Sequence, residues 1–329
     1  MDISADVSTS SLDSLPTLAM KLGRPASLNQ DRIKANLDKS IALVTGGNKG
    51  IGFGICKQLA SKCVTVILTA RDEKKGQEAI KKLSDEFGLT NVIFHQLDVT
   101  NNSHIVAVAD FVKTRFGKLD VLVNNAVGGG YYLPQPLDMQ IPWDERYAFM
   151  TKTHIETYEL VEECLKINYF GMKYLTEALL PLLESSDSGR VVNISSNAGR
   201  LRFLNNEGLV KELDDINNLT LEKLDDLVKS YLKSFKEGAL EENGWKLPGG
   251  FGTYKASKIF VNAYTRIAAK MYPNLYINCV QPGHTQTEGS SCTGSQTVEE
   301  AAKSPVMLAL DDSGRTGLFY DRTEITAYY

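Results

Sequence analysis

The chain has 329 residues, of which 43% are hydrophobic and 23% charged, and its formal net charge is −4. This composition is typical of a globular protein and excludes a disordered, collagen-like or fibrous chain, while the slight excess of acids argues against nucleic acid as a partner. Five cysteines lie scattered without CxxC spacing, which predicts buried thiols in a reducing compartment. No apolar run approaches the roughly 18 residues of a membrane helix, so we expect a cytoplasmic protein without membrane contact.

The first forty residues differ from the rest of the chain. Residues 1–20 contain acids, many Ser and Thr, and neither Lys nor Arg. A secretory signal needs a basic start and an apolar core, and a transit peptide avoids acids, so neither fits. We expect residues 1–40 to form a flexible N-terminal extension. An arm docked through Leu15, Leu18 and Met20 is the alternative.

From residue 41 onward, apolar strand patterns alternate with helical patterns. Strands are predicted at 41–44, 63–69, 92–97, 119–123, 190–195, 275–280 and 317–320. Helices are predicted at 50–59, 73–87, 102–115, from the 160s to 183, and at 253–271. Continuous apolar strands separated by helices are typical of a parallel sheet covered on both faces. The pattern predicts one α/β domain over 41–329, a doubly wound parallel sheet of the Rossmann type.

A glycine turn follows the first strand and is the first candidate site. A strand, a glycine turn and a helix start let backbone N–H groups and the helix dipole meet a pyrophosphate. Its spacing is GxxxGxG, and a glycine turn at this place can also serve packing alone. The cofactor contacts predicted here are Gly46, Asn48, Lys49, Gly50, Ile51 and Gly52.

The end of the second strand favours NADP over NAD. An acid there would bind the ribose 2′-hydroxyl of NAD, whereas a base accommodates the 2′-phosphate of NADP. Arg71 stands at this position, and Lys49 in the glycine turn offers a second cation. Asp72 is the counter-argument, but as the next residue it should point away. Arg71 could also be an ordinary surface charge.

Two further strand ends carry polar residues where ligands of open α/β sheets bind. Asp98 and Val99 follow the third strand, and Asn125 and Ala126 follow the fourth. We predict that they contact the cofactor, although each pair could also be a turn or a cap.

Tyr254 and Lys258 are four residues apart, on one face of a predicted helix. A phenol with a pKa of about 10 is a poor acid–base group at neutral pH. An ammonium group and an oxidised nicotinamide ring beside it would lower that pKa. The alternative is a surface pair with no role.

Together with the glycine turn, this pair resembles the short-chain dehydrogenase/reductase family. The resemblance extends from about residue 40 to the C-terminus. Its motifs occur in the family order as TGGNKGIG at 45–52, DV at 98–99, NNA at 124–126, Asn168, VNISS at 192–196, YKASK at 254–258 and PG at 282–283. One departure is Val127, which stands where the family usually has glycine.

The resemblance implies roles for individual residues. Tyr254 would exchange a proton with the substrate, and Lys258 would lower its pKa and hold the nicotinamide ribose. Ser196 would hydrogen-bond the substrate carbonyl oxygen. Asn168 would interrupt its helix and hold a water that relays protons to Lys258. Further cofactor contacts are implied at Pro282, Gly283 and Thr287.

Two inserts refine the resemblance. Between Ser196 and Tyr254 lie 57 residues, where Thr220 is a predicted N-cap and an apolar stripe from Leu221 to Phe235 predicts a helix. The insert that comes first in the chain, the first insert, spans about 128–163, so the 57-residue stretch contains the second insert. Such inserts, at about 128–163 and 200–250, look like those of the plant salutaridine reductase and menthone (neomenthol) reductase branch, which is similar to monomeric carbonyl reductases. This resemblance implies a helical flap over the substrate, and a monomer.

Aromatic residues of the first insert could line an apolar pocket or merely pack the insert onto the domain. They are Tyr131, Tyr132, Trp143, Tyr147 and Phe149. His284 is predicted to be scaffold, and the histidines show no metal-ligand spacing, so no metal is expected.

The sequence therefore predicts an NADPH-dependent carbonyl reductase for a small-molecule ketone or aldehyde. A menthone-like terpenoid, an alkaloid ketone and a small carbonyl all stay open as substrates. A reductase of the C=C bond in enones is one alternative, but members of that kind replace the tyrosine. A non-catalytic NADP-binding protein is the other.

Overall fold

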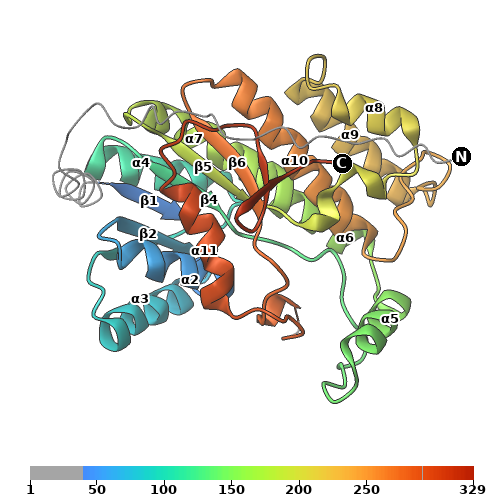
Figure 1. Ribbon diagram of the computed structural model, residues 1–329, viewed down its shortest axis with the longest axis horizontal. Coiled ribbons are helices and arrows are strands. Elements are labelled where there is room, and N and C mark those ends of the chain that lie inside the picture. Colours follow the sequence, from blue (N-terminus) through green and yellow to red (C-terminus); the bar gives the residue numbers. More distant parts are fainter. Residues whose placement is uncertain (1–39, 291) are drawn as a thin grey trace, which may run out of the picture. The chain divides into compact units, whose positions relative to one another are not determined.

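An eight-stranded sheet organises the part of the chain that the computed structural model describes, residues 40–290 and 292–329. Its strands stand in the order β3-β2-β1-β4-β5-β6-β7-β8, and only β7 and β8 pair antiparallel (Figure 1). The strands are β1 Ile41–Val44, β2 Thr65–Ala70, β3 Val92–Gln96, β4 Val121–Asn124, β5 Arg190–Ile194, β6 Tyr276–Gln281, β7 Phe319–Asp321 and β8 Glu324–Thr326. The predicted doubly wound sheet is confirmed, and β8 is an antiparallel edge strand that was not predicted.

The strand order reverses between β1 and β4. Leu43 of β1 pairs with Ile67 of β2 on one side and with Leu122 of β4 on the other. The chain thus runs outward from β1 to β3 and returns to place β4 beside β1. Ligands of open α/β sheets bind at the carboxyl ends of the strands on either side of such a switch.

Helices cover both faces of the sheet. In chain order they are α2 Gly50–Ala60, α3 Glu73–Phe87, α4 Asn102–Phe116, α5 Trp143–Thr153, α6 Tyr158–Leu165, the π turn η1 Lys166–Gly171, α7 Met172–Glu184, η2 Asn197–Gly199, η3 Leu201–Phe203, α8 Glu207–Asp214, α9 Leu221–Lys236, α10 Gly252–Met271, η4 Glu288–Ser290 and α11 Val298–Ala309. Helices α4, α6, α7, α9 and α10 contribute to the core on one face. Helices α2, α3 and α11 contribute to the core on the other.

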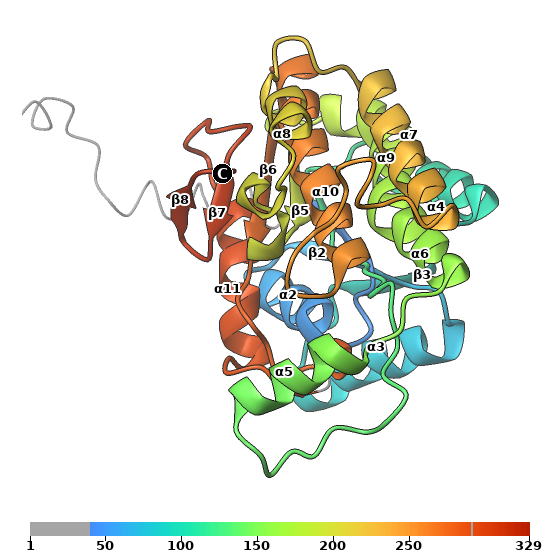
Figure 2. The ribbon, with the colours of Figure 1, turned by 90° about the vertical axis from the view of Figure 1, so that its right-hand side faces the viewer.

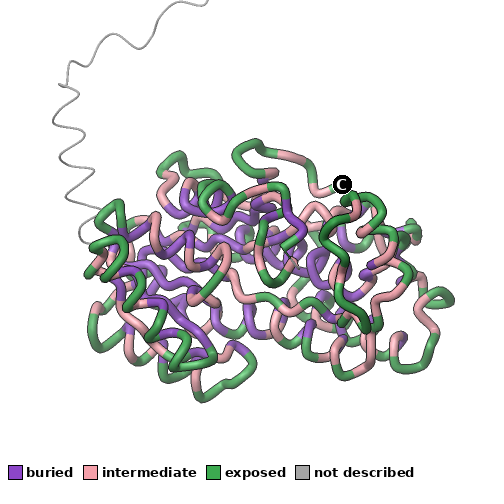
Figure 3. The backbone as a smooth tube through the Cα atoms, turned by 90° about the horizontal axis from the view of Figure 1, so that it is seen from below, coloured by how far each residue is buried: buried purple, intermediate pink, exposed green. Residues whose placement is uncertain are grey.

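The strands β1, β2, β4, β5 and β6 are buried at most of their positions because both faces of the sheet are covered. In β1, Ile41 and Leu43 enter the core of the first face, whereas Ala42 and Val44 enter the core of the second. Successive side chains of a strand point to opposite faces, so a strand buried on both sides needs no polar alternation. Figure 3 shows the buried backbone positions in the interior and the exposed ones on the outer loops.

The helical region from the 160s to Leu183 is not one continuous α-helix. It consists of α6 and α7 joined by the π turn η1, which contains Asn168. The predicted insert helix matches α9, and the predicted cap Thr220 accepts a hydrogen bond from Lys223 N at 3.2 Å. The predicted interruption at Asn168 is thus a π turn, in which the helix gains an extra residue per turn but does not break.

Three helices have no counterpart among the predicted elements. Helices α5 and α8 each bury a single residue, Met150 and Leu213, which leaves almost no apolar stripe to detect. Helix α11 begins with a capping box, in which Thr297 and Glu300 bond each other's backbone N–H groups. That signal is readable in the sequence, but Pro305 inside the helix hides the pattern.

The prediction that all five cysteines are buried is wrong for two of them. Cys56, Cys164 and Cys279 are buried, whereas Cys63 and Cys292 are exposed. Both exposed cysteines have positive φ angles, 66° and 57°, in turns at the end of α2 and after η4. A turn at the surface points its side chain outward whatever its polarity.

The described residues belong to one compact unit, Leu37–Tyr329. The predicted extension, residues 1–40, lies outside the described residues except for Ser40, and the single-domain organisation stays a prediction. Within residues 40–290 and 292–329, no helix has the length and apolar character needed to cross a bilayer.

Candidate active site

The glycine turn after β1 depends on the absence of side chains. Gly46 and Gly50 have φ angles of 62° and 54°, in the left-handed region that favours glycine. A Cβ on Gly52 would lie 2.3 Å from the carbonyl oxygen of Gly46. Lys49 is the N-cap residue of α2 and makes no side-chain cap bond. The amino end of α2 therefore presents backbone N–H groups at the switch between β1 and β4.

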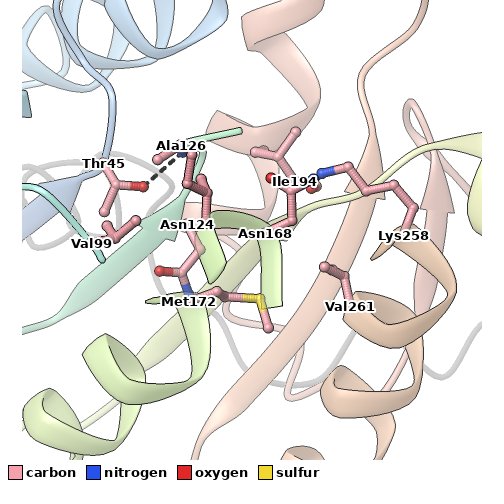
Figure 4. A pocket seen from close by; sticks show the side chains of 10 residues that line it. Thr45, Val99, Asn124, Ala126, Asn168, Met172, Ile194, Lys258 and Val261 are labelled. Atoms are coloured by element: carbon pink, nitrogen blue, oxygen red, sulfur yellow. Dashed lines mark hydrogen bonds between the residues drawn. The ribbon is translucent and has the colours of Figure 1, made fainter. Parts of the chain in front are cut away.

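The residues after β4 fix this turn through main-chain contacts. Thr45 Oγ1 accepts a hydrogen bond from the N–H group of Asn125 at 2.8 Å. It accepts another from the N–H group of Ala126 at 2.9 Å, which Figure 4 shows. Asn125 Nδ2 in turn donates to the carbonyl oxygens of Thr45 at 2.8 Å and Gly46 at 3.2 Å. The Asn125 side chain is thus committed to holding the glycine turn. The participation of Thr45 was not predicted, although it is the first residue of the motif.

The two cations predicted to bind a phosphate each face a carboxylate. Lys49 Nζ lies 2.6 Å from Glu288 Oε2, and Arg71 Nη1 lies 4.0 Å from Glu163 Oε1. Both pairs are exposed, so a ligand anion can compete for either cation. Asp72 caps α3 by accepting a hydrogen bond from Lys75 N at 3.0 Å, so its carboxylate is engaged at the start of that helix.

An open cavity of about 180 Å³ lies beside Arg71. Asp98 lines it, and Asp98 Oδ1 accepts hydrogen bonds from both Thr100 N at 2.9 Å and Thr100 Oγ1 at 2.7 Å. Asp98 therefore both stabilises the turn at Thr100 and lines the cavity. Val99 lines a different, smaller cavity that also contains Lys258.

The loop after β6 lies against the glycine turn. A Cβ on Gly50 would lie 3.3 Å from Thr287 Cγ2. Pro282 is buried, and Gly283, with a φ of 98°, donates its N–H to Gln281 Oε1 at 2.9 Å. Thr287, one of the predicted cofactor contacts, thus lies beside Gly50 of the glycine turn.

Helix α10 carries the tyrosine and the lysine. The Lys258 ammonium is buried, donates to the carbonyl oxygen of Ile194 at 2.8 Å, and lies 5.7 Å from the centre of the Tyr254 ring. Ser196, just beyond β5, accepts a hydrogen bond from Ala198 N at 3.1 Å through its Oγ. The lysine bond to Ile194 ties α10 to the end of β5 and so holds these residues together.

Burial sets the protonation states of Tyr254 and Lys258 in the protein without its cofactor. It raises the pKa of the Tyr254 phenol to about 12, and hydrogen bonding with Ser196 opposes that rise. Burial lowers the pKa of the Lys258 ammonium to about 8, which the thiols of Cys164 and Cys279 oppose. At neutral pH the phenol therefore keeps its proton, and the lysine is mostly charged.

The side chain of Asn168 is fully engaged. Its Oδ1 accepts from Gly128 N at 2.7 Å, and its Nδ2 donates to Gly128 O at 3.0 Å and to Ser257 Oγ at 2.9 Å. Ser257 Oγ donates to the carbonyl oxygen of Tyr254 at 2.7 Å. Asn168 thus joins Gly128, at the start of the first insert, to α10. Ser257 was not singled out from the sequence, although it lies inside YKASK.

A small internal cavity of about 10 Å³ lies between Asn168 and Lys258. Figure 4 shows Lys258 reaching into this region from α10, with Asn168 and Thr45 on the other walls. A space of this size accommodates about one water molecule, and its polar walls offer hydrogen-bonding partners.

The second insert is fastened by a carboxylate on α9. Asp225 accepts a hydrogen bond from Tyr169 Oη at 2.7 Å, and its other oxygen lies 2.5 Å from Lys173 Nζ. Tyr169 follows Asn168 in the π turn, and Lys173 lies one helical turn further on. Helix α9 is therefore anchored next to the turn that carries Asn168.

Aromatic rings of the first insert contact the residues around the site. Trp143 lies 4.5 Å from the His284 ring, and Tyr131 lies 4.6 Å from Phe251, the residue before α10 (distances between ring centres). Trp143 and Tyr147, on α5, are 38% and 40% exposed. Helix α5 lies at the margin of the unit in both views (Figures 1 and 2). These contacts join the first insert to the loop after β6 and to the start of α10.

A Rossmann sheet with a glycine turn at its switch point is typical of dinucleotide-binding proteins, and α10 places a tyrosine and a lysine side by side. The chain belongs to the short-chain dehydrogenase/reductase family, since the family model described as short chain dehydrogenase matches residues 40–208. It is therefore an oxidoreductase of a family that uses a nicotinamide cofactor.

Similar proteins include several plant reductases. The (+)-neomenthol dehydrogenase of Capsicum annuum is 43% identical over 306 residues, 87% of this chain and 97% of the relative. The (−)-isopiperitenone reductase of Mentha piperita is 44% identical over 309 residues, 88% of this chain and 98% of the relative. The structure of salutaridine reductase from Papaver somniferum has a TM-score of 0.80 at 45% identity, over 86% of this chain and 99% of its own. The predicted resemblance to this branch is confirmed.

Proposed function

We propose that the protein is an NADPH-dependent carbonyl reductase that converts a ketone or aldehyde into an alcohol. The observation that carries this proposal is the grouping of Tyr254 and Lys258 on α10 at the end of β5, in which the ammonium lies 5.7 Å from the phenol ring centre and donates to the carbonyl oxygen of Ile194, two residues before Ser196. The similarity to salutaridine reductase and to neomenthol dehydrogenase supports the same chemistry.

The glycine turn fits a dinucleotide. The amino end of α2, which Lys49 leaves without a side-chain cap, suits a pyrophosphate. Lys49 and Arg71 would bind the 2′-phosphate by exchanging their present carboxylate partners for it. When bound, NADPH supplies the hydride that reduces the carbonyl carbon. The other contacts that we propose are Gly46, Asn48, Gly50, Ile51, Gly52, Asp98, Val99, Asn125, Ala126, Pro282, Gly283 and Thr287.

Tyr254 would act as the general acid. Its phenol is protonated at neutral pH because burial raises its pKa to about 12, so it can donate to the carbonyl oxygen as negative charge develops there. Ser196 Oγ already accepts from Ala198 N, which leaves its own proton free for the same oxygen. The Lys258 ammonium would stabilise the phenolate that remains.

Asn168 would supply the route for proton return. Its amide is held by Gly128 and Ser257, so it acts by shaping the cavity of about 10 Å³ shared with Lys258. One water in this cavity would carry protons to Lys258 and then to Tyr254.

The inserts at about 128–163 and 200–250 would form the lid over the substrate. Menthone-like terpenoid ketones, alkaloid ketones and small carbonyls are the candidate substrates. We also propose that the protein acts in the cytoplasm. We further propose that it is a monomer, because the insert helix α9 packs on α6 and α10 and covers the face that these two helices form.

The proposal is tested by following NADPH absorbance with a panel of such ketones and aldehydes. We expect consumption of NADPH with at least one of them, together with formation of the alcohol. Binding of NADPH without turnover across the panel would instead favour a non-catalytic NADP-binding protein.

A second candidate is reduction of the C=C bond in a conjugated ketone. The 44% identity to an isopiperitenone reductase favours keeping it. Tyr254 argues against it, since the tyrosine is replaced in members of that kind. Product analysis with an unsaturated ketone separates an unsaturated alcohol from a saturated ketone.

A further inference from the structure

The helix that carries Tyr254 and Lys258 begins without a cap of its own. Its N-cap residue is Phe251, which has left-handed backbone angles (φ 54°, ψ 43°) and makes no side-chain cap bond. Its first turn contains no acidic residue. The first N–H groups of a helix have no partner within the helix, so they need one from elsewhere. This need is greatest where a reacting side chain emerges from the first turn.

Glu156, from the first insert, supplies the missing cap. Its Oε1 accepts a hydrogen bond from Thr253 N at 3.3 Å, and its Oε2 accepts one from Thr253 Oγ1 at 3.0 Å. Glu156 precedes Thr253 by 97 residues and lies just before α6. A carboxylate at a helix amino end also opposes the positive end of the helix dipole. The contact joins the first insert to the residue directly before Tyr254.

The second insert reaches the same residue. Tyr231 Oη, on α9, lies 3.2 Å from Thr253 Oγ1. Tyr231 is fully buried and packs edge-on against Trp245 at 5.6 Å and Phe260 at 6.3 Å, measured between ring centres. Its hydroxyl is therefore held in place. Thr253 Oγ1 thus contacts a side chain from each insert.

His154 fixes the residue that precedes the helix. Its Nε2 accepts a hydrogen bond from Phe251 N at 3.1 Å, while its Nδ1 lies 3.0 Å from the carbonyl oxygen of Met150. The His154 and Phe251 rings also pack at 4.5 Å between centres. These contacts hold Phe251 in a backbone conformation that a bulky residue seldom adopts. The start of α10 is thus set by groups of the first insert.

We propose that Glu156 is a positioning residue, which fixes the first turn of α10 and with it the phenol of Tyr254. The inserts would then do more than cover the substrate, because the acid of the reaction is in place only while Glu156 and Tyr231 hold Thr253. The inference rests on the proposed carbonyl reductase function. A displacement of about 1 Å at a reacting group can lower turnover about a hundredfold.

The test compares Glu156→Ala with Glu156→Gln. We expect the alanine variant to lower kcat at least about tenfold, with the Kd for NADPH within twofold of wild type by fluorescence titration. The glutamine variant should regain part of the loss, because its amide oxygen still accepts one bond from Thr253. Glu145→Gln, an exposed glutamate of the same insert, is the control and should match wild type. Melting temperatures measured alongside report folding.

Tyr231→Phe provides a second route if Glu156→Ala fails to fold. It removes only the hydroxyl that contacts Thr253 and should lower kcat severalfold. Because Tyr231 and Glu156 share this partner, combining Tyr231→Phe with Glu156→Gln should cost less than the product of the single effects.

The inference is overturned if Glu156→Ala retains wild-type kcat. If Glu156→Ala does not fold, it is overturned when Glu156→Gln and Tyr231→Phe both retain wild-type kcat. It is also overturned if kcat, NADPH affinity and melting temperature fall together, since that pattern marks a general loss of structure. Absence of ketone turnover in the wild-type protein would instead contradict the proposed function itself.

Discussion

The cofactor end and the insert end of the site are held by different kinds of contact. At the cofactor end, Thr45 and Asn125 bond main-chain atoms of the glycine turn and the loop after β4. At the insert end, two carboxylates bond the inserts to the rest of the domain. Glu156 bonds the start of α10, and Asp225 bonds residues in and after the π turn. Main-chain contacts fix a turn whose surface remains open to a ligand, whereas a carboxylate holds its partners only while it is present and charged. We therefore expect changes at the cofactor end to alter cofactor affinity, and changes at the insert end to alter turnover and stability.

The largest effect is expected at Tyr254, where the two ends meet. Tyr254→Phe removes the proton donor and should lower kcat about a thousandfold, the range of general acid catalysis. The Kd for NADPH should stay near wild type, because the ring and the Lys258 bond to Ile194 remain. Tyr174→Phe, at an exposed tyrosine, is the control. Retained turnover in Tyr254→Phe would remove the phenol from the mechanism.

A stability measurement sharpens the comparison at the insert end. Asp225→Ala leaves the buried Lys173 ammonium without its nearest carboxylate and Tyr169 Oη without its acceptor. Breaking such a pair should lower the free energy of unfolding by about 3 kcal/mol, more than a hundredfold in the folding equilibrium. The matched control is Asp226→Ala, whose pair with Lys229 is exposed and should contribute less than about 1 kcal/mol. Equal urea midpoints for the two variants would contradict this.

Charge reversal at Arg71 tests the cofactor end. Arg71→Asp should raise the Kd for NADPH by about thirtyfold through loss of a charge-assisted phosphate contact, while the Kd for NADH changes much less. Melting temperature should not move, because Arg71 is exposed and its pair with Glu163 is long. Lys62→Asp, an exposed change beyond α2, controls for net charge. An unchanged preference between the two cofactors would refute the phosphate site.

The pH dependence of kcat/KM tests Lys258, and its expected change between pH 7 and pH 9, about tenfold, is the smallest of these effects. Burial lowers the pKa of Lys258 to about 8 in the protein alone, and kcat/KM reports groups of the free enzyme. The ammonium is present below that pH and lost above it, so reduction should be constant up to about pH 7 and fall about tenfold per pH unit well above pH 8. Tyr254, with its pKa raised to about 12, does not titrate in this range. A flat profile to pH 10 would contradict the assignment of Lys258.

The glycine turn and the helix that carries Tyr254 can be predicted from the sequence because their signals are local. Gly46, Gly52 and the apolar run of β1 follow from backbone sterics and burial, and the spacing of Tyr254 and Lys258 follows from helix periodicity alone. The order of the family motifs further indicates Ser196 and Asn168 as candidate site residues. It does not predict that the Asn168 amide is hydrogen-bonded to Gly128 and Ser257.

The insert end escapes prediction because its contacts join residues far apart in the chain. Nothing near Glu156 in sequence indicates that it caps a helix 97 residues later, and a bulky residue with left-handed angles such as Phe251 carries no sequence signal. Of the features at the insert end, the helix α9 can be predicted from local sequence, because it has a capping threonine and a broad apolar stripe.

Transfer of deuterium from NADPH labelled at both C4 positions, during reduction of an α,β-unsaturated ketone, tests the central claim most directly. The account predicts an unsaturated alcohol with deuterium on the carbinol carbon, detected by mass spectrometry and NMR, because Tyr254 protonates the oxygen. A saturated ketone labelled on the carbon β to the carbonyl, or a reduced product without label, would contradict it.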